Sequence, residues 1–315
     1  MKPRVSVGVP VRNGAAYLAV ALESVLTQSL GDLEVVIGDN ASTDGTEALC
    51  RELAAADPRV RYFRHEANIG AGPNHNFVFE RSRAEYFRWA THDDVCAPTL
   101  LARCVEVLDG RPEVVLVHPR TRRIDESGAP IGDYGATVAV SAPAPSRRLA
   151  ALLLARPSAL HYCYPIYGMM RSSTLAATPV IGPYNSSDAV LLAEMALRGP
   201  WHEIPEHLFS SRQHAASSLR ANATPAEVAA WFRPDMGHRF PAPRSRLLAG
   251  YGRAIRRVPM PGRERLACAR VLARWLGLDR NWRVIGGEAK IVLGERLGIR
   301  EVDPGAGPGP VLRPR

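Results

Sequence analysis

The sequence predicts an α/β protein built on a doubly wound, mostly parallel sheet. Over residues 1 to about 118, apolar runs with the length of buried strands alternate with amphipathic stretches that have the length of helices. Strands and helices that alternate in this way require right-handed crossovers between parallel strands. The chain has 315 residues, of which 46% are hydrophobic and 23% charged. This composition favours one large globular domain with an appendage over a disordered chain.

Strands and helices follow one another regularly in this first part. Short runs rich in β-branched and other apolar residues predict the strands, which are Val5 to Val9, Leu33 to Ile37, Val60 to Phe63, Tyr86 to Ala90 and Val114 to Val117. Apolar residues three or four positions apart predict the helices, which are the stripe of Leu18, Leu22, Val25 and Leu26 and the ranges Thr46 to Ala56, Asn74 to Arg83 and Leu100 to Leu108. Each predicted helix lies between two strands, as the crossovers require.

The pattern becomes irregular after Val117. The next signals are a hairpin turn at Asp125 to Gly128, a Pro-rich connector at Ser141 to Ser146, a helix at Ser187 to Arg198 and a short strand at Trp201 to Ile204. We therefore interpret residues 119–218 as a mixed α+β half of the domain that residues 1–118 begin. Residues 219–302 are predicted to form a basic helical extension, and residues 303–315, rich in Pro, Gly and Arg, a disordered tail.

The positive charge of the chain is concentrated in its last third. Residues 215–315 contain 19 Lys and Arg against 8 Asp and Glu, a balance of +11, so residues 1–214 contribute −2 to the whole-chain charge of +9. Arginines that alternate with leucine, valine and tryptophan are typical of basic amphipathic helices, which bind anionic membrane surfaces. The alternative is a solvated, Arg-rich face without a ligand. Nucleic acid is not expected as a partner, because no recognition motif accompanies the charge.

The cysteines and the apolar segments exclude several classes of protein. The five cysteines are scattered and contain no CxxC pair, so neither a disulfide framework nor a zinc site is predicted. No stretch approaches the roughly 20 apolar residues of a membrane span, and Val5 to Val9 reads as a strand rather than as the core of a signal peptide. We therefore expect a cytoplasmic protein, with possible peripheral contact to the inner face of the membrane through the basic helices.

Polar residues follow three of the predicted strands. Pro10 to Asn13, Asp39 to Gly45 and the pair Asp93 and Asp94 all follow strand ends. In open α/β sheets, ligands bind beyond the carboxyl ends of the strands, so these loops predict one shared crevice. Adjacent carboxylates at such an edge suit a divalent cation. The alternative for Asp93 and Asp94 is a helix N-cap ahead of Leu100 to Leu108, where an acid complements the helix dipole.

Several motifs occur together in the order found in one known family. They are Val5 to Gly14 (VSVGVPVRNG), Ser24 to Ser29, Val36 to Thr46 (VIGDNASTDGT), Asn68-Ile69-Gly70 and the Asp93-Asp94 pair. Together they resemble the family 2 glycosyltransferases of the GT-A fold, strongly over about residues 1–118 and more weakly to about 218. Several motifs in the right order are far more specific than any one alone. The resemblance implies a GT-A domain that uses a nucleoside-diphosphate sugar linked to UDP, GDP or dTDP.

The resemblance assigns nucleotide contacts to the first half. Asp39 occupies the place of the family's acid that accepts a hydrogen bond from the base. The alternative is a purely structural role: Asp39, like Asp44, would then brace a turn or cap the next helix. The other implied nucleotide-binding residues are Pro10, Arg12, Asn13, Asn68 and Asp93. Arg12 could hold phosphate, although a surface arginine is an equally good interpretation.

The resemblance also implies a Mn²⁺ or Mg²⁺ ion. The family's metal motif begins with an acid, whereas this chain reads Thr91-His92-Asp93-Asp94, so that Asp93 and Asp94 are the candidate ligands. His214 in Arg212 to Ser217 resembles a histidine that reaches back to the metal or diphosphate. Phosphate oxygens and water would complete the coordination shell. The ion would stabilise the departing nucleoside diphosphate.

The catalytic base implied by the resemblance is Asp188. In the family a Glu-Asp pair opens this helix, and here Ser187 replaces the glutamate. The alternative interpretation is a simple helix start, because Ser-Ser-Asp before an apolar run is typical of one. A carboxylate opposite the leaving group gives a single displacement with inversion at the anomeric carbon. The Gln-x-x-Arg-Trp motif of processive members is missing, which favours transfer of one sugar per encounter.

Other classes fit the sequence less well. A dinucleotide-binding oxidoreductase would need GxGxxG after the first strand, and a sugar-nucleotide pyrophosphorylase would need a Gly-rich basic loop there; Gly8 to Asn13 shows neither. The predicted acceptor is a bacterial cell-envelope glycan, a lipid-linked sugar or a secondary metabolite. The remaining alternative is a catalytically degenerate GT-A domain that binds a nucleotide or scaffolds a glycan assembly complex.

Overall fold

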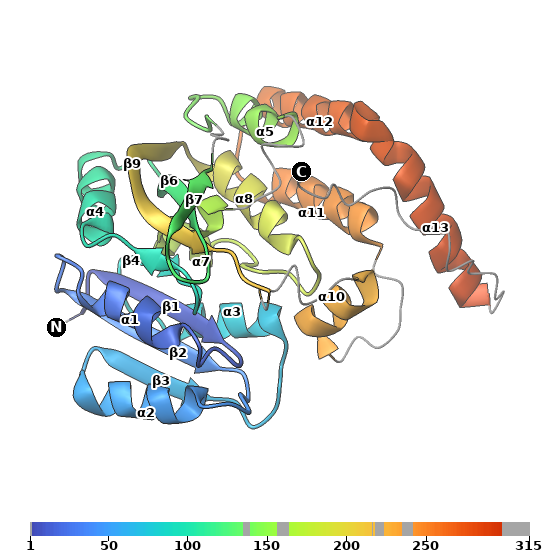
Figure 1. The fold of residues 1–315 in the computed structure, drawn as a ribbon. Coiled ribbons are helices and arrows are strands. Elements are labelled where there is room, and N and C mark those ends of the chain that lie inside the picture. Colours follow the sequence, from blue (N-terminus) through green and yellow to red (C-terminus); the bar gives the residue numbers. More distant parts are fainter. Residues whose placement is uncertain are drawn as a thin grey trace.

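A nine-stranded sheet with helices on both faces organises the chain (Figure 1). The structure, a computed structural model, describes residues 2–134, 139–155, 164–215, 217, 224–234 and 242–297. The strand order is β3-β2-β1-β4-β8-β6-β9-β5, with β7 paired to β6 beside this path. The α/β class predicted from the alternating pattern is confirmed.

The predicted parallel strands form one half of the sheet. β1 (Val5–Val11) pairs in parallel with β2 (Leu33–Asp39) and with β4 (Tyr86–Trp89), and β2 pairs in parallel with β3 (Val60–Arg64). The crossovers contain α1 (Leu18–Leu26), α2 (Thr46–Ala56) and α3 (Ala71–Glu80). Helix α3 begins at Ala71 rather than at the predicted Asn74, because the loop before it ends at Gly70 with a φ of 91°.

The second half of the sheet mixes strand directions. β6 (Leu116–Ile124) pairs in parallel with β9 (Trp201–Arg212) and antiparallel with β7 (Pro130–Asp133) and β8 (Met169–Arg171). β5 (Val95–Cys96) pairs antiparallel with β9. β9 extends well beyond the predicted Trp201 to Ile204, because its pairing with β6 continues past irregularities in register around Arg120.

Two apolar clusters pack on the two faces of the sheet. Val35 and Val36, adjacent residues of β2, are both fully buried but belong to different clusters. Successive strand residues point to opposite faces, so a strand covered on both sides reads as a continuous apolar run. Helices α1 and α4 (Leu100–Gly110) contribute to the cluster on one face, and α3 and α8 (Ser187–Arg198) to the cluster on the other.

The basic extension is helical, as predicted, and part of it packs on the α/β body. The remaining elements are α5 (Pro145–Leu153), η1 (Tyr164–Tyr167), α7 (Ser172–Ala176), α10 (Pro225–Phe232), α11 (Pro243–Arg257), α12 (Gly262–Gly277), η3 (Leu278–Arg280) and α13 (Asn281–Leu297). Helix α11 packs on α8, and α12 on α5. Among the helices that the structure describes, none is both long and apolar enough to cross a bilayer. The predicted disordered tail, residues 303–315, lies outside the described residues.

Two buried charged side chains fix the position of α8. Near its carboxyl end, Glu194 is 1% exposed and pairs with Arg198 at 2.8 Å and with Arg257 of α11 at 2.6 Å.

Arg148 of α5 is the second of these side chains. It donates to the carbonyls of Leu197 at 3.1 Å, Ala142 at 2.8 Å and Pro143 at 2.6 Å, and also to that of Ala196. The Arg148 guanidinium therefore donates hydrogen bonds to carbonyls at the end of α8 that have no N–H partner within the helix.

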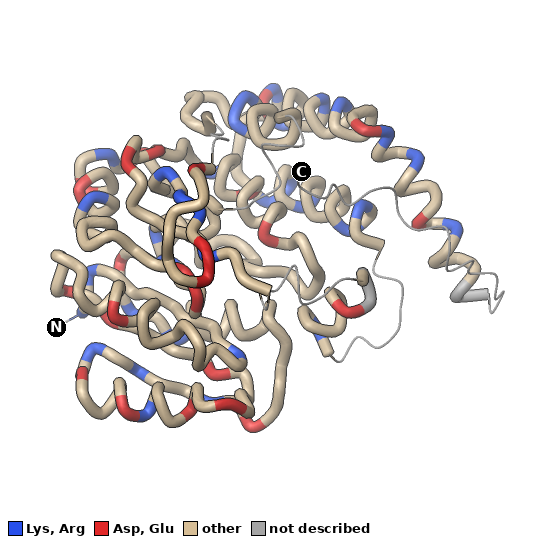
Figure 2. The backbone as a smooth tube through the Cα atoms, in the orientation of Figure 1, with Lys and Arg blue, Asp and Glu red and all other residues tan. Residues whose placement is uncertain are grey.

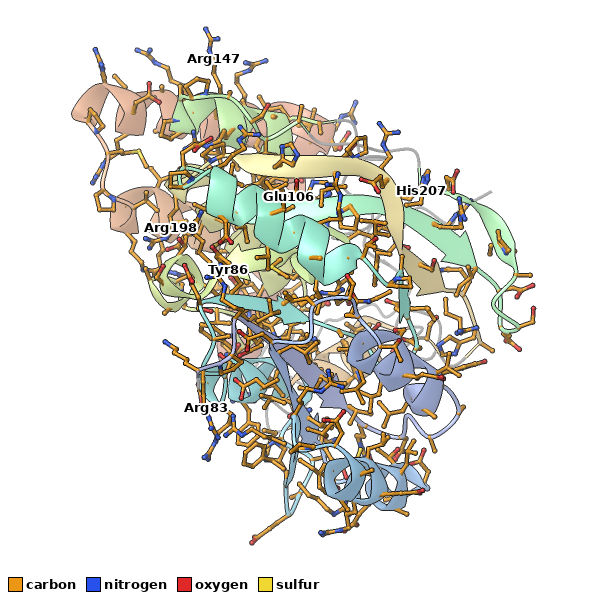
Figure 3. All side chains as sticks on the ribbon, turned by 90° about the vertical axis from the view of Figure 1, so that its left-hand side faces the viewer. Arg83, Tyr86, Glu106, Arg147, Arg198 and His207 are labelled. Carbon is orange, nitrogen blue, oxygen red and sulfur yellow. The ribbon has the colours of Figure 1, made fainter. Side chains whose placement is uncertain are left out.

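Replacement of Arg148 by methionine is expected to lower the free energy of unfolding by about 3 kcal/mol, because buried carbonyls lose their donors. Arg147→Met is the matched control: Arg147 is its neighbour on the same helix but is exposed and projects outward in Figure 3. Urea denaturation of both variants measures the difference. Equal stability of the two variants would show that Arg148 has no role in fixing α8.

Candidate functional site

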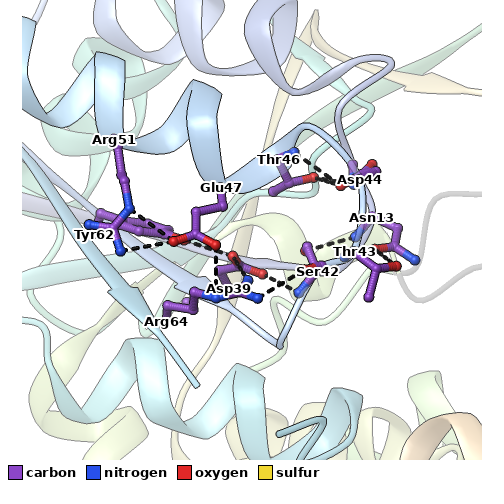
Figure 4. Close-up of polar contacts among 12 residues, drawn as sticks. Asn13, Asp39, Ser42, Thr43, Asp44, Thr46, Glu47, Arg51, Tyr62 and Arg64 are labelled. Atoms are coloured by element: carbon purple, nitrogen blue, oxygen red, sulfur yellow. Dashed lines mark hydrogen bonds and ion pairs between the residues drawn. The ribbon is translucent and has the colours of Figure 1, made fainter. Parts of the chain in front are cut away.

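The loops that follow β1 and β2 are joined by hydrogen bonds. The Asn13 N–H donates to Ser42 Oγ at 3.0 Å, and the Thr43 N–H donates to Asn13 Oδ1 at 2.8 Å (Figure 4). Asn13 has a φ of 53°, in the left-handed region that asparagine tolerates better than most residues. These bonds give Asn13, which the sequence predicted to contact the nucleotide, a structural role in joining the two loops. Its neighbour Arg12 is exposed beyond the end of β1, while Pro10 is half-buried within the strand.

Asp44 braces the turn that leads into α2. One carboxylate oxygen, Oδ1, accepts hydrogen bonds from the N–H of Thr46 at 3.0 Å and from its hydroxyl at 2.5 Å. The other, Oδ2, accepts from the Ala15 N–H at 3.1 Å. These bonds support the turn-bracing interpretation of Asp44.

Asp39 lies at the end of β2 and is completely buried. Its carboxylate accepts hydrogen bonds from the Ser42 N–H at 2.9 Å, the Tyr62 hydroxyl at 2.7 Å and Arg64 Nη1 at 2.8 Å (Figure 4). Burial by itself would raise the pKa of Asp39, but these hydrogen bonds outweigh it and lower the pKa below its usual value. The carboxylate is therefore held ionised with all of its close donors supplied by the protein. A base approaching it would also meet the exposed Arg64.

Asn68 belongs to a second braced loop, ahead of α3. Its Oδ1 accepts from Asn40 Nδ2 at 2.7 Å and from the Gly70 N–H at 2.9 Å, while Asn40 Oδ1 accepts from the Ile69 N–H at 2.7 Å. A Cβ at Gly70 would lie 2.4 Å from the carbonyl oxygen of Phe232 in α10. The glycine is thus required by both its positive φ and this close approach, which explains the Asn68-Ile69-Gly70 motif in structural terms.

Asp93 and His214 meet across the sheet edge. Asp93 Oδ2 lies 2.8 Å from His214 Nε2, although 121 positions separate them in the sequence. Their side chains are only 14% and 5% exposed. The ring of Tyr17, in the loop before α1, lies 4.9 Å from the His214 ring between centroids. This places the loops after β1, β4 and β9 next to one another, as one crevice requires.

The Asp94 side chain is buried and does not take part in the contact between Asp93 and His214. Its Oδ1 accepts the Arg212 N–H at 2.8 Å. Burial, and then the negative charge of Asp93, raise the pKa of Asp94 to about 7, although the hydrogen bond from the Arg212 N–H opposes the shift. The N-cap interpretation of the acid pair is wrong: β5 separates the pair from α4, and Thr99 occupies the cap position.

The predicted metal ligands are only partly brought together. Among the described residues, no three or more His, Cys, Asp and Glu side chains surround one point as a complete metal site would require. Asp93 and His214 still offer a carboxylate oxygen and an imidazole nitrogen side by side. This pair fits a divalent ion that takes its other ligands from phosphate oxygens and water, which is the usual mode for Mg²⁺ with phosphorylated substrates.

Arg212 joins the Asp93 loop to the β6–β7 turn, a role that the sequence analysis did not assign to it. Its Nε donates to the Asp93 carbonyl at 2.9 Å, and its Nη1 donates to the carbonyls of Asp125 at 3.1 Å and Glu126 at 2.9 Å. The guanidinium also lies 4.8 Å above the Tyr17 ring. The family-like segment Arg212 to Ser217 pointed to His214, and only the pairing of distant strands reveals the contacts of Arg212.

Replacement of Arg212 by methionine is expected to destabilise the protein by about 3 kcal/mol, because three carbonyls and the Tyr17 ring lose a buried cation. The matched control is Arg120→Met, at an exposed arginine of neighbouring β6. Thermal unfolding followed by circular dichroism compares the two variants. An unchanged melting temperature for Arg212→Met would contradict this role.

Asp188 lies in the first turn of α8. One of its carboxylate oxygens, Oδ1, accepts the Ala189 N–H at 2.9 Å, and among the described residues no donor reaches the other. Ser187, which occupies the place of the family's glutamate, is buried and donates to the Gly182 carbonyl at 3.1 Å. Ser187 therefore fixes the start of the helix, while Asp188 keeps one oxygen available.

Helix α3 is hydrogen-bonded both to the loop that leads into α8 and to the end of β4. Asn76 exchanges two hydrogen bonds with the backbone of Ile181, at 2.9 and 3.0 Å. Beside it, His75 Nδ1 contacts the Ala71 carbonyl at 2.7 Å, and Trp89 at the end of β4 donates to the His75 carbonyl at 3.0 Å. Burial lowers the pKa of His75, and the negative charge of Asp188 partly opposes this shift.

Solved structures of known proteins share this fold. The chain resembles Staphylococcus aureus TarS, residues 1–349 in complex with UDP, with a TM-score of 0.54 and 16% identity over 94% of this chain and 92% of that one. It also resembles the mannosyltransferase PcManGT of Pyrobaculum calidifontis in complex with GDP-Man and Mn²⁺, with a TM-score of 0.53 and 18% identity over 96% and 77% of the two chains. The fold is therefore that of the GT-A glycosyltransferases.

The chain belongs to glycosyl transferase family 2, whose model matches residues 6–174. An uncharacterized glycosyltransferase of Rickettsia felis is 33% identical over 128 residues, which are 40% of this chain and 21% of that protein. The chondroitin synthase of Escherichia coli is 32% identical over 126 residues, 40% of this chain and 18% of the synthase. The match thus spans about a fifth of each of these relatives. The family suggested by the sequence motifs is confirmed.

Proposed function

We propose that this protein is a metal-dependent, inverting glycosyltransferase that moves one sugar from a nucleoside-diphosphate sugar to an acceptor hydroxyl. The observation that carries the proposal is the Asp93–His214 contact of 2.8 Å at the carboxyl edge of the parallel strands. We assign Asp39, at the end of β2, to the nucleotide and Asp188, in the first turn of α8, to the acceptor. Support for the donor class also comes from the solved complexes of similar proteins with UDP, UDP-GlcNAc and GDP-Man.

Asp188 supplies the base in the proposed reaction. Its free oxygen takes the proton from the acceptor hydroxyl as that oxygen forms a bond to the anomeric carbon. On the opposite side, the bond from the anomeric carbon to the diphosphate breaks, and the electron pair leaves with the nucleoside diphosphate. Attack and departure on opposite sides invert the configuration. Asn76 fixes the backbone of Ile181, in the loop that leads into the Asp188 helix.

The diphosphate end of the donor belongs beside Asp93 and His214. A bound Mn²⁺ or Mg²⁺ would neutralise the charge that develops on the leaving diphosphate. Arg212 holds the backbone of Asp93, and Tyr17 packs on His214, so the two ligands are oriented before a donor binds. On the base side, the exposed Arg64, held at the end of β3 by its bond to the buried Asp39, would meet the nucleobase first.

The proposed acceptor is a bacterial surface glycan, a lipid-linked sugar or a secondary metabolite, reached from the cytoplasmic side of the membrane. The α+β half contributes this side of the crevice, because Asp188 and its supporting loop come from it. Support for a glycan acceptor comes from the family and from its relatives, among them a chondroitin synthase.

A thermal-shift screen tests the proposed donor. UDP-, GDP- and dTDP-sugars are added with Mn²⁺ or with EDTA, and a bound donor raises the melting temperature by mass action. We expect one nucleotide class to stabilise the protein in Mn²⁺ and much less in EDTA. The same donor should be slowly hydrolysed in Mn²⁺, which a catalytically inactive nucleotide-binding domain would not do. No stabilisation by any of the three classes would overturn the proposal.

A further inference from the structure

Helices α12 and α13 present a surface of unpaired cations. Seven basic side chains are exposed on these helices and the turn between them, namely Arg263, Arg265, Arg270, Arg274, Arg280, Arg283 and Lys290. Among the described residues, no carboxylate lies within ion-pair distance of any of them. Blue segments recur along both helices in Figure 2, and Figure 1 places the helices at the outer edge of the molecule. We call this surface the α12–α13 face.

The acids of the same helices do not balance this charge. Glu264 accepts a hydrogen bond from the Ser146 N–H at 3.2 Å, and Glu288 is buried and accepts from the backbone of Arg244 and Ser245. Of the three acids in residues 262–294, Glu264, Asp279 and Glu288, Asp279 is the one that is exposed. The face is therefore strongly positive.

Arginine abundance alone does not explain this surface. In the α/β body, several exposed arginines stand beside carboxylates: Arg51 pairs with Glu47 at 2.9 Å, and Arg103 pairs with Glu206 at 2.9 Å. Others, such as Arg12 and Arg81, are exposed without an ion pair among the described residues. Ion pairs thus neutralise part of the body's arginines and none of the seven cations of the α12–α13 face. A merely solvated, Arg-rich face predicts no such difference.

Large apolar side chains are exposed among these cations. Leu266 is 55% exposed, Trp282 56%, Val284 38% and Leu293 56%, and these are four of the seven large hydrophobic side chains exposed in the described chain. Trp282, Gly286, Ala289 and Leu293 follow helical spacing on the side of α13 opposite the buried Glu288. An aromatic ring and leucines within a ring of cations are the pattern of helices that lie in a membrane interface.

We propose that the α12–α13 face docks on an anionic phospholipid surface. Its cations are complementary to anionic headgroups, and its apolar side chains gain burial at the headgroup level. Binding of these cations to the phosphates of a nucleic acid would leave the exposed leucines unexplained. A two-fold dimer through this face would bring the cations of both copies together. The inference deepens the proposed function, because a docked enzyme would meet an acceptor held at the membrane.

A vesicle flotation assay with the full chain tests the inference. The probes are phosphatidylcholine vesicles with and without phosphatidylglycerol. We expect flotation with the anionic vesicles alone, weakening as salt screens the charges. The triple variant Arg270→Glu, Arg274→Glu, Arg283→Glu should bind about a hundredfold more weakly, and Trp282→Ser about tenfold more weakly.

The matched control has the same charge change on the α/β body. It carries Arg51→Glu, Arg83→Glu and Arg111→Glu, at exposed arginines outside the face, and should float like the wild-type protein. Absence of flotation with anionic vesicles would overturn the inference. So would equal loss in both triple variants, tighter binding to single-stranded RNA than to the vesicles, or dimerisation through the face.

Donor hydrolysis in solution separates this inference from the proposed function. The α12–α13 variants should hydrolyse the donor at the wild-type rate without vesicles, because the face is distinct from Asp93 and Asp188. Failed flotation with intact hydrolysis would refute the docking surface alone. Normal flotation without any donor stabilisation or hydrolysis would refute the proposed function and leave the surface in place.

Discussion

Asp188→Asn is expected to reduce the rate of sugar transfer at least about a thousandfold while the protein remains folded and still binds its donor. General-base catalysis contributes rate factors of about 10² to 10⁴. Asparagine preserves the shape of the side chain and can still accept the Ala189 N–H. It cannot take the proton of the acceptor hydroxyl. The loss should therefore fall on kcat, with little change in the affinity for the donor.

The competing interpretation of Asp188, as an acid that merely starts α8, predicts a different result. Removing a carboxylate from the first turn of a helix costs about 1 kcal/mol of stability and has no specific effect on transfer. Thermal unfolding and single-turnover transfer, measured on the same preparation, separate the two. Asp32→Asn, the same change at an exposed loop acid, is the control. Full transfer activity in Asp188→Asn would remove the base assignment.

The fold followed from local patterns because each strand of the parallel half carries its own signal. Val35 and Val36 both lie in a buried strand, and an uninterrupted apolar run is the expected sign of a strand covered on both faces. The second half was harder to predict. β9 continues to Arg212 through polar residues such as Ser210 and Ser211, whose strand conformation depends on pairing with β6 and β5 rather than on their own preference.

The candidate site was predictable where residues stand at strand ends. Asp39 is the last residue of β2, and Asp93 lies in the loop after β4, so the topology alone places them at one edge. The partners of these acids were not predictable. Arg64 and Tyr62 come from β3, and Arg212 from the far end of β9, so their roles depend on which strands pair. No periodicity within a segment contains that information.

Loss of Asp93 is expected to abolish the effect of the metal on donor binding. In the wild-type protein, Mn²⁺ should raise the affinity for the donor. In Asp93→Ala, the affinity for the donor should fall by about a hundredfold and become the same in Mn²⁺ as in EDTA. Alanine removes the carboxylate and leaves His214 Nε2 without its partner at 2.8 Å. Loss of a ligand-orienting contact typically costs 10- to 100-fold in metal affinity, so His214→Gln should give a smaller loss of the same kind.

A second Asp–His contact provides the control for this experiment. Asp133 of β7 and His207 of β9 lie 3.6 Å apart, and the Asp133 side chain is 52% exposed. Asp133→Ala therefore removes a carboxylate beside a histidine without touching the proposed site, and it should leave the Mn²⁺ dependence intact. Isothermal titration of the donor measures all three variants. If the wild-type protein binds its donor equally well in Mn²⁺ and in EDTA, Asp93 and His214 do not form a metal site, and their contact serves only to join β4 to the end of β9.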